Sequence, residues 1–180
     1  MSKNAHRHVI TLVVCGLLTA LGVILGGLLS IPAVPFGSYS LKIGFGVLPV
    51  ILSGVLFGPA YGGIVGALTD LIQALLFPKG AYMPWFTVVG IFFGLVPGLF
   101  FMKKQKPTFV RLLAAVAAGQ LFGSVFLNTL LLVELYGSPR QLIWVRLANQ
   151  AVMIPLYAAL LYAVCKLLAR HKVLDKLERI

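Results

Sequence analysis

The sequence predicts an all-helical (all-α) integral membrane protein with six transmembrane helices and both termini in the cytoplasm. Of its 180 residues, 60% are hydrophobic and only 11% are charged, whereas soluble domains carry about 25% charged residues. So few polar groups cannot cover so much apolar surface, and lipid must therefore solvate most of the chain. The apolar residues also fall into separate runs, and roughly 20 such residues can cross a bilayer as a helix.

The N-terminal half of the chain predicts three helices. The first apolar run, Val9–Ser30, is too long for the core of a signal peptide, so we interpret it as a retained helix. The next segment, Ile31–Lys42, contains prolines and polar residues and is expected to be an outer loop. Gly58-Pro59 then divides a long apolar stretch into Gly44–Phe57 and Ala60–Phe77. Since Gly44–Phe57 is short for a full crossing, a re-entrant hairpin is the alternative there.

The C-terminal half predicts three more helices, each bounded by turn or charged residues. They cover Met83–Met102, Phe109–Leu135 and Leu142–Ala169. The sequence shows no internal repeat and no low-complexity linker. We therefore expect a single membrane domain over residues 1–180.

The basic residues determine the expected orientation. With six crossings, both termini and the loop at residues 103–111 share one side of the membrane. That side collects eleven of the fifteen basic residues: Lys3, Arg7, Lys103, Lys104, Lys106, Arg111, Lys166, Arg170, Lys172, Lys176 and Arg179. The positive-inside rule places this side in the cytoplasm. Outside remain Lys42, Lys79, Arg140 and Arg146, which would hold an anion, with contact to lipid headgroups as the alternative.

Polar side chains of three predicted helices share one level in the outer half of the membrane. Asp70 lies inside the third helix, where a charge is costly and usually marks a site. Its position is roughly 10 Å below the outer end of that helix. Gln73 follows on the same helix face, and Asn128 and Asn149 lie at a comparable depth on the fifth and sixth helices. This level predicts a pocket, and hydrogen bonding between helices is the alternative.

Aromatic side chains gather on the same outer side. An interfacial belt explains several of them without any ligand, but together they could also stack on a flat ring. They are Phe36, Tyr39, Phe77, Tyr82, Trp85, Tyr136 and Trp144.

Several classes of function find no support in the sequence. It has no G-x-x-x-x-G-K-[ST] motif for ATP and neither the G-x-S-x-G nor the H-E-x-x-H motif. Cys15 and Cys165 lie in separate apolar runs, which suits neither a disulfide framework nor a metal site. We therefore expect neither an enzyme nor a cofactor, a bound metal or a nucleic acid partner.

A series of short motifs resembles a known family. The motifs are Leu29-Ser30-Ile31-Pro32, Leu41-Lys42-Ile43-Gly44-Phe45-Gly46-Val47-Leu48-Pro49, Leu56-Phe57-Gly58-Pro59, Gly66-Ala67-Leu68-Thr69-Asp70-Leu71 and Leu75-Leu76-Phe77-Pro78, continued by Leu127-Asn128-Thr129-Leu130 and Arg146…Pro155. In order and spacing they resemble the folate-specific S components of energy-coupling factor (ECF) transporters.

The resemblance implies a six-helix subunit of a bacterial plasma membrane that captures a vitamin outside. It also implies two kinds of partner, a transmembrane T protein and a pair of cytoplasmic ATPases, which topple the subunit and release the vitamin inside. Family members dock on the T protein through two alanines four residues apart, and here Gly16 and Ala20 stand in those places. Many relatives carry an arginine just before the Leu-Ser-Ile-Pro stretch, where this chain has Gly26 and Gly27.

Folate suits the residues that were selected independently of the resemblance. Its pterin ring presents an N–H beside an amino group, which suits the carboxylate of Asp70, and its rings could stack on the aromatic side chains. Its two tail carboxylates could meet Lys42, Lys79, Arg140 or Arg146. The alternatives are an S component for riboflavin or thiamine, a small proton-coupled carrier that uses Asp70, and a structural membrane protein without a ligand.

Overall fold

The first helix and a β-hairpin form the N-terminal part of the molecule. The computed structural model describes residues 3–28, 31–36, 39–78, 82–102, 107–136 and 142–170. Helix α1 covers Lys3–Gly27, and strands β1 (Ile31–Phe36) and β2 (Tyr39–Ile43) follow it. The strands pair antiparallel, with Ile31 opposite Ile43 and Phe36 opposite Tyr39.

The hairpin lies where an outer loop was expected, so the regular structure of the described residues is helical except for this hairpin. Its residues include β-branched and aromatic side chains, which suit a strand. Its two prolines lack a backbone N–H, and strands tolerate such residues at edges or bulges. The register shifts between Pro32 and Val34, which places an irregularity beside the first proline.

Glycine 58 joins the next two helices, α2 (Val47–Phe57) and α3 (Pro59–Leu76). Its φ of 93° lies in a region that residues with a side chain rarely adopt. Pro59 occupies the first position of α3, where its missing N–H leaves no intrahelical bond unmade. Helix α2 begins at Val47 rather than at the expected Gly44, so it has only 11 residues.

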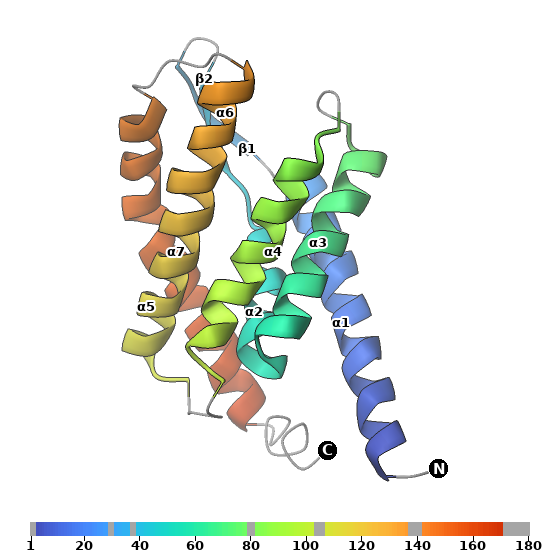
Figure 1. Cartoon of the computed structure of the whole chain (residues 1–180). Helices are drawn as coiled ribbons and strands as arrows, with labels where there is room; N and C mark the ends of the chain where they lie inside the picture. Colours follow the sequence, from blue (N-terminus) through green and yellow to red (C-terminus); the bar gives the residue numbers. More distant parts are fainter. Residues whose placement is uncertain are drawn as a thin grey trace.

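Helix α4 (Pro84–Leu99) comes next. Three further helical segments form one continuous rod: α5 (Phe109–Gln120), the π-helix η1 (Leu121–Leu127) and α6 (Asn128–Tyr136). The sequence predicted this rod as one uniform helix. Helix α7 (Leu142–Arg170) completes the molecule. Figure 1 shows α1 to α4 on one side of the bundle, α5 to α7 on the other, and the hairpin at the end opposite the two termini.

Helices α2, α3 and α4 approach each other through glycines. A Cβ at Gly62 would lie 2.7 Å from the Cα of Gly54 and would collide with the carbonyl oxygen of Gly94. Only a missing side chain allows such backbone contact. Side chains fill the rest of the interior, including the buried cluster of Ile51, Leu112, Val116, Leu161 and Cys165.

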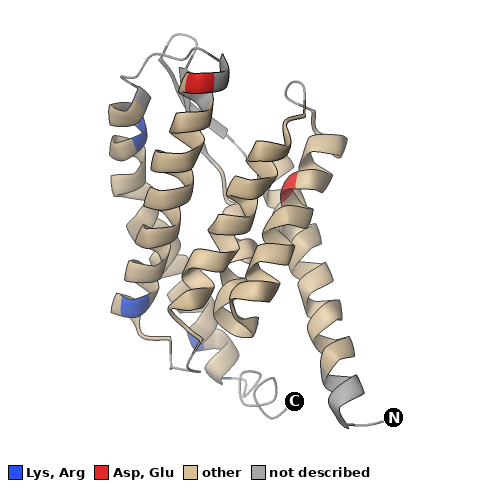
Figure 2. Ribbon diagram, in the orientation of Figure 1, with Lys and Arg blue, Asp and Glu red and all other residues tan. Residues whose placement is uncertain are grey.

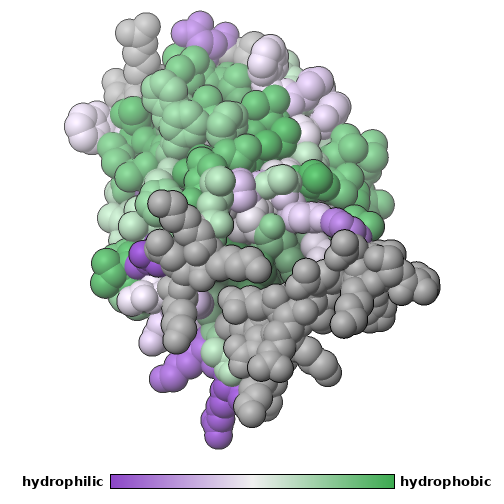
Figure 3. Space-filling view, turned by 60° about the horizontal axis from the view of Figure 1, so that its bottom comes forward, coloured by the Kyte–Doolittle hydropathy of each residue, from purple (hydrophilic) through white to green (hydrophobic). Residues whose placement is uncertain are grey.

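The described surface is that of a membrane protein. Four helices are long and apolar enough to cross a bilayer: His8–Gly27, Pro59–Leu76, Phe109–Leu131 and Arg146–Arg170. Two shorter apolar helices, Val47–Phe57 and Pro84–Leu99, accompany them. Hydrophobic green covers most of the described surface in Figure 3, and Leu17 and Trp144, for example, are 66% and 72% exposed. The predicted helical membrane fold is therefore confirmed.

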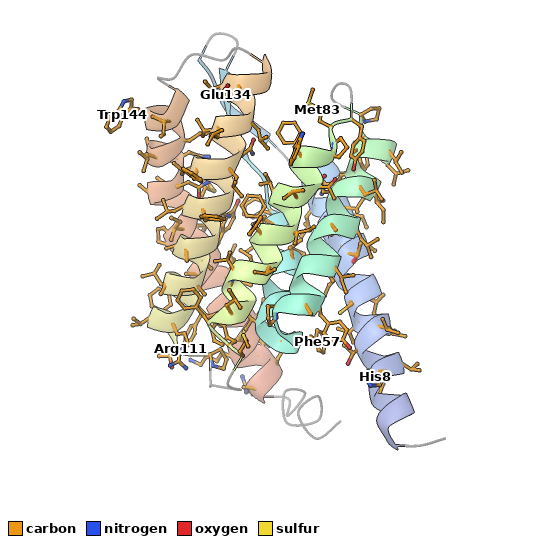
Figure 4. All side chains as sticks on the ribbon, viewed as in Figure 1. His8, Phe57, Met83, Arg111, Glu134 and Trp144 are labelled. Atoms are coloured by element: carbon orange, nitrogen blue, oxygen red, sulfur yellow. The ribbon has the colours of Figure 1, made fainter. Side chains whose placement is uncertain are left out.

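The helix ends fall into two groups at opposite ends of the bundle. Figure 4 places Met83, Glu134 and Trp144 at one end, and His8, Phe57 and Arg111 at the other. The start of α1 and the end of α7 lie at the second end (Figure 1). We call the end with Met83 the upper end and the other the lower end.

Candidate functional site

Asp70 lies in the upper part of α3 and contacts α4 through a hydrogen bond. The Thr87 hydroxyl donates to its Oδ2 at 2.8 Å, and the Tyr82 hydroxyl lies 2.8 Å from the same Thr87 oxygen. In Figure 2 the helices carry few charged residues, and an acidic segment stands inside the upper part of α3. Asp70 therefore sits inside the bundle wall with a hydroxyl as its described partner.

Glycines explain why α4 comes so close to Asp70. A Cβ at Gly90 would lie 2.9 Å from the Gly66 carbonyl oxygen and 3.1 Å from the Asp70 Cβ. Because neither helix has a side chain at this crossing, the first turn of α4 reaches the carboxylate. The contact between α3 and α4 is the most extensive among the described elements.

Gln73, one turn further along α3, contacts α1. Its Nε2 donates to the Gly22 carbonyl oxygen at 3.0 Å. The Gln73 amide also occupies the space beside Gly26, where a Cβ would collide with it. A larger residue at Gly26 could enter only if Gln73 moved away.

A second polar cluster joins the π-helix to α7 around Ser124. Arg146 Nη1 donates to the Ser124 carbonyl oxygen at 2.9 Å, and Gln150 Nε2 donates to Ser124 Oγ at 3.0 Å. The Thr129 hydroxyl donates to the same carbonyl at 3.5 Å. Gln150 is only 6% exposed, and its Oε1 has no partner among the described residues.

The π-helix makes this cluster possible. Its wider turn pairs the Asn128 N–H with the Gly123 carbonyl five residues earlier. Where such a turn returns to α-helix, a carbonyl can lose its backbone donor and become available to side chains, and such bulges often occur at functional sites. Ser124 lies at this transition and receives donors from α7. The hydrogen bond to Ser124 places the guanidinium of Arg146 in the upper half of the bundle.

The other predicted ligand residues with described side chains differ in how deeply they are buried. Asn128 and Asn149 are half-buried on α6 and α7. Tyr82 and Trp85 are 46% and 59% exposed, which is typical of an interfacial belt.

Five predicted ligand residues have no described side chain. The backbones of Phe36, Tyr39 and Lys42 lie in the hairpin, but their side chains lie outside the described part of the structure. Lys79 lies outside the described residues altogether, as does Arg140.

Two polar residues of the site escaped the sequence analysis. Thr87 and Ser124 are hydroxyl residues within apolar runs, and hydroxyls are common in membrane helices as packing contacts. The signal that could have selected them is their depth, since each lies at about the level of a predicted ligand residue. In the described part of the chain, no group of three His, Cys, Asp or Glu residues could hold a metal ion.

The predicted docking face of α1 is open. A Cβ at Gly16 would meet nothing within 4 Å, and Ala20 is exposed. Their neighbours Leu12, Val13 and Leu17 are more than half exposed.

Comparison with known proteins identifies relatives over most of the chain. The family model described as "ECF-type riboflavin transporter, S component" matches residues 7–173. The folate transporter FolT of Clostridium novyi (strain NT) is 36% identical over 140 residues, which are 77% of this chain and 81% of that protein. The FolT of Streptococcus mutans serotype c is 30% identical over 144 residues, 77% of this chain and 75% of that protein.

Solved structures agree in fold. A crystal structure of FolT bound with folic acid matches with a TM-score of 0.73 and 28% identity, covering 86% of this chain and 92% of that one. An S component for biotin from an ECF-type ABC transporter matches with a TM-score of 0.70 at 21% identity, over 94% of this chain and 95% of that one. The second likeness shows the fold alone. The chain belongs to the S components of ECF transporters, a family of multi-pass proteins of the bacterial plasma membrane.

Proposed function

We propose that this chain is a folate-binding S component that captures the vitamin at the upper end of the bundle. The main support for this proposal is that two residues of opposite charge lie on different helices of the bundle. Asp70 on α3 and Arg146 on α7 both lie in the upper half, each held by a hydrogen bond. Folate has matching ends, because its pterin presents N–H donors and its tail carries two carboxylates.

The relatives support folate among the vitamins. The curated relatives FolT are folate transporters, and one matching crystal structure holds folic acid. The family model names riboflavin, so riboflavin is the second candidate. Its uncharged flavin ring and ribityl chain carry no carboxylate, the group to which the guanidinium of Arg146 is best suited.

The proposed ligand contacts follow from this arrangement. Asp70 would accept from the pterin, and Arg146 with the amides of Asn128 and Asn149 would bind the tail. The aromatic residues Tyr82, Trp85, Phe36 and Tyr39 would line the mouth with Lys42 and Lys79. Gln73 contributes by holding α3 against α1.

The proposed topology has six crossings, a single membrane domain over residues 1–180, and the lower end in the cytoplasm. Arg111 and the termini support this orientation, because they belong to the lower end and basic residues favour the cytoplasmic side. The subunit would bind without chemical conversion. A T protein docked at Gly16 and Ala20, with two ATPases, would supply the energy for release.

The test is a binding titration with the purified full chain in detergent against folate, riboflavin, thiamine and biotin. Saturable folate binding at least tenfold tighter than that of the other vitamins is expected. Tighter riboflavin binding would overturn the folate assignment and leave the family intact. Asp70→Asn should weaken folate binding by about 1–3 kcal/mol, the cost of leaving a buried donor unpaired.

A further inference from the structure

We propose that Thr87 is a positioning residue for Asp70, and that Tyr82 extends this contact to the outer surface. This three-residue relay would fix the carboxylate so that the site selects ligands with paired N–H donors. The inference rests on the proposed function, in which Asp70 meets the ligand.

The direction of the relay follows from counting protons. A threonine hydroxyl has one hydrogen to donate, and Thr87 gives it to Asp70 Oδ2 at 2.8 Å. The 2.8 Å contact between Tyr82 and Thr87 can then form only if Tyr82 donates. The order is therefore Tyr82 to Thr87 to Asp70, and each donation strengthens the next by polarisation.

The relay leaves the carboxylate with capacity for a ligand. An ionised carboxylate has about four lone-pair sites on its two oxygens, and Thr87 uses one. Its donation restricts rotation of the carboxylate at a close crossing of α3 and α4, where a Cβ added to Gly90 would lie 3.1 Å from the Asp70 Cβ. A fixed acceptor pair discriminates strongly against a ligand that lacks one N–H, because a buried acceptor is then left unpaired.

The outer end of the relay is accessible. Tyr82 is 46% exposed and lies two residues before the start of α4, so its ring reaches the interface while its hydroxyl contacts Thr87. The sequence assigned Tyr82 to ring stacking. The structure adds a role for its hydroxyl, which a phenylalanine could not fill.

The experiment compares variants that change one group each. Thr87→Val removes the hydroxyl and keeps the shape, Thr87→Ser keeps the hydroxyl, and Tyr82→Phe keeps the ring. Each purified full-length variant is titrated with folate and with 2-deaminofolate, which lacks the pterin amino group. Thr87→Val should weaken folate binding about tenfold and 2-deaminofolate binding by less than threefold, while Thr87→Ser stays within threefold of wild type.

Tyr82→Phe should weaken folate binding about threefold, with no further loss when combined with Thr87→Val.

A double-mutant cycle separates positioning from general packing. In the Asp70→Asn background, Thr87→Val should have no further effect on affinity, because the group that it positions is gone. An equal loss in both backgrounds, or an equal loss for both ligands, would overturn the relay. A drop in thermal stability with unchanged affinity would overturn it as well.

A second measurement does not depend on folate. In ligand-free protein, the infrared carboxylate band that disappears in Asp70→Asn should shift in Thr87→Val and stay in place in Thr87→Ser. An unshifted band would contradict the relay even if folate binds well. If wild-type protein binds no folate but the band still shifts in Thr87→Val, the proposed function is contradicted and the relay is retained.

Discussion

The two sides of the bundle hold their helices together by different means. On the side of α2, α3 and α4, glycines bring backbones into direct contact, as at Gly54, Gly62 and Gly94. On the side of η1 and α7, Ser124 collects donors from Arg146 and Gln150. Backbone contact is tightly constrained, because no rotamer change relieves a collision, whereas side-chain hydrogen bonds can be rearranged. The comparison indicates that one side is a fixed wall and the other is an adaptable one.

The largest loss of folding stability is expected from Gly94→Val. Its Cβ would collide with the Gly62 carbonyl, so α3 and α4 must separate at a cost of about 3 kcal/mol or more. Thermal unfolding of the purified protein in detergent measures the loss. The control is Gly63→Ala, whose Cβ would meet the Ile91 side chain at 3.2 Å and other atoms at no less than 3.9 Å. Equal unfolding temperatures for the two variants would contradict the fixed wall.

A smaller loss is expected from Ser124→Ala. Without the Ser124 hydroxyl, the buried Gln150 amide loses its one described side-chain partner, at a cost of about 1–2 kcal/mol. Adding Gln150→Leu should recover most of this loss, because removing both partners is nearly neutral. Chemical unfolding of the single and double variants provides the comparison. Additive losses would show that the hydrogen bond does not join the two helices.

Gln73→Leu should lower the free energy of unfolding by less again. The expected loss is about 0.6 kcal/mol, the average for a hydrogen bond between membrane helices. The bond to Gly22 ties α3 to α1, so the change should appear as faster amide exchange near Gly22. Gln73→Glu keeps the size of the side chain and, when the carboxyl group is ionised, has no donor. If amide exchange near Gly22 is unchanged in both variants, the hydrogen bond from Gln73 does not stabilise α1.

The smallest effect on the isolated subunit is expected from Gly16→Ala. The added methyl group meets nothing within 4 Å, and alanine favours helix over glycine by up to about 1 kcal/mol. The unfolding temperature should therefore stay equal or rise slightly. A clear decrease would show that the face of α1 is occupied within the subunit.

Most helices could be predicted from the sequence because apolar runs and turn residues act locally. Gly58-Pro59 marks a helix boundary, and its positive φ agrees with that reading. The hairpin was missed because prolines at 32 and 35 interrupt the alternation that marks a strand. The π-helix was missed because an extra residue in a turn leaves the composition of an apolar helix unchanged.

The candidate site could be predicted only in part, because some of its residues matter only through contacts between helices. Asp70 stands out because a charge inside an apolar run is costly wherever it faces. Thr87 does not stand out, because its importance depends on the approach of α4 to α3 at Gly66 and Gly90. Ser124 depends likewise on the register of the π-helix against α7. The assignment to S components, made from ordered motifs, is confirmed by the relatives.

The shortness of two central helices has a consequence for the surrounding lipid. Helix α2 has 11 residues and α4 has 16, so they measure about 16 Å and 24 Å against a hydrocarbon layer of about 30 Å. Lipid next to these helices must become thinner, or the protein must tilt, at a fraction of a kcal/mol per Å of mismatch. The cost of fitting this subunit to its bilayer should therefore depend mainly on α2 and α4.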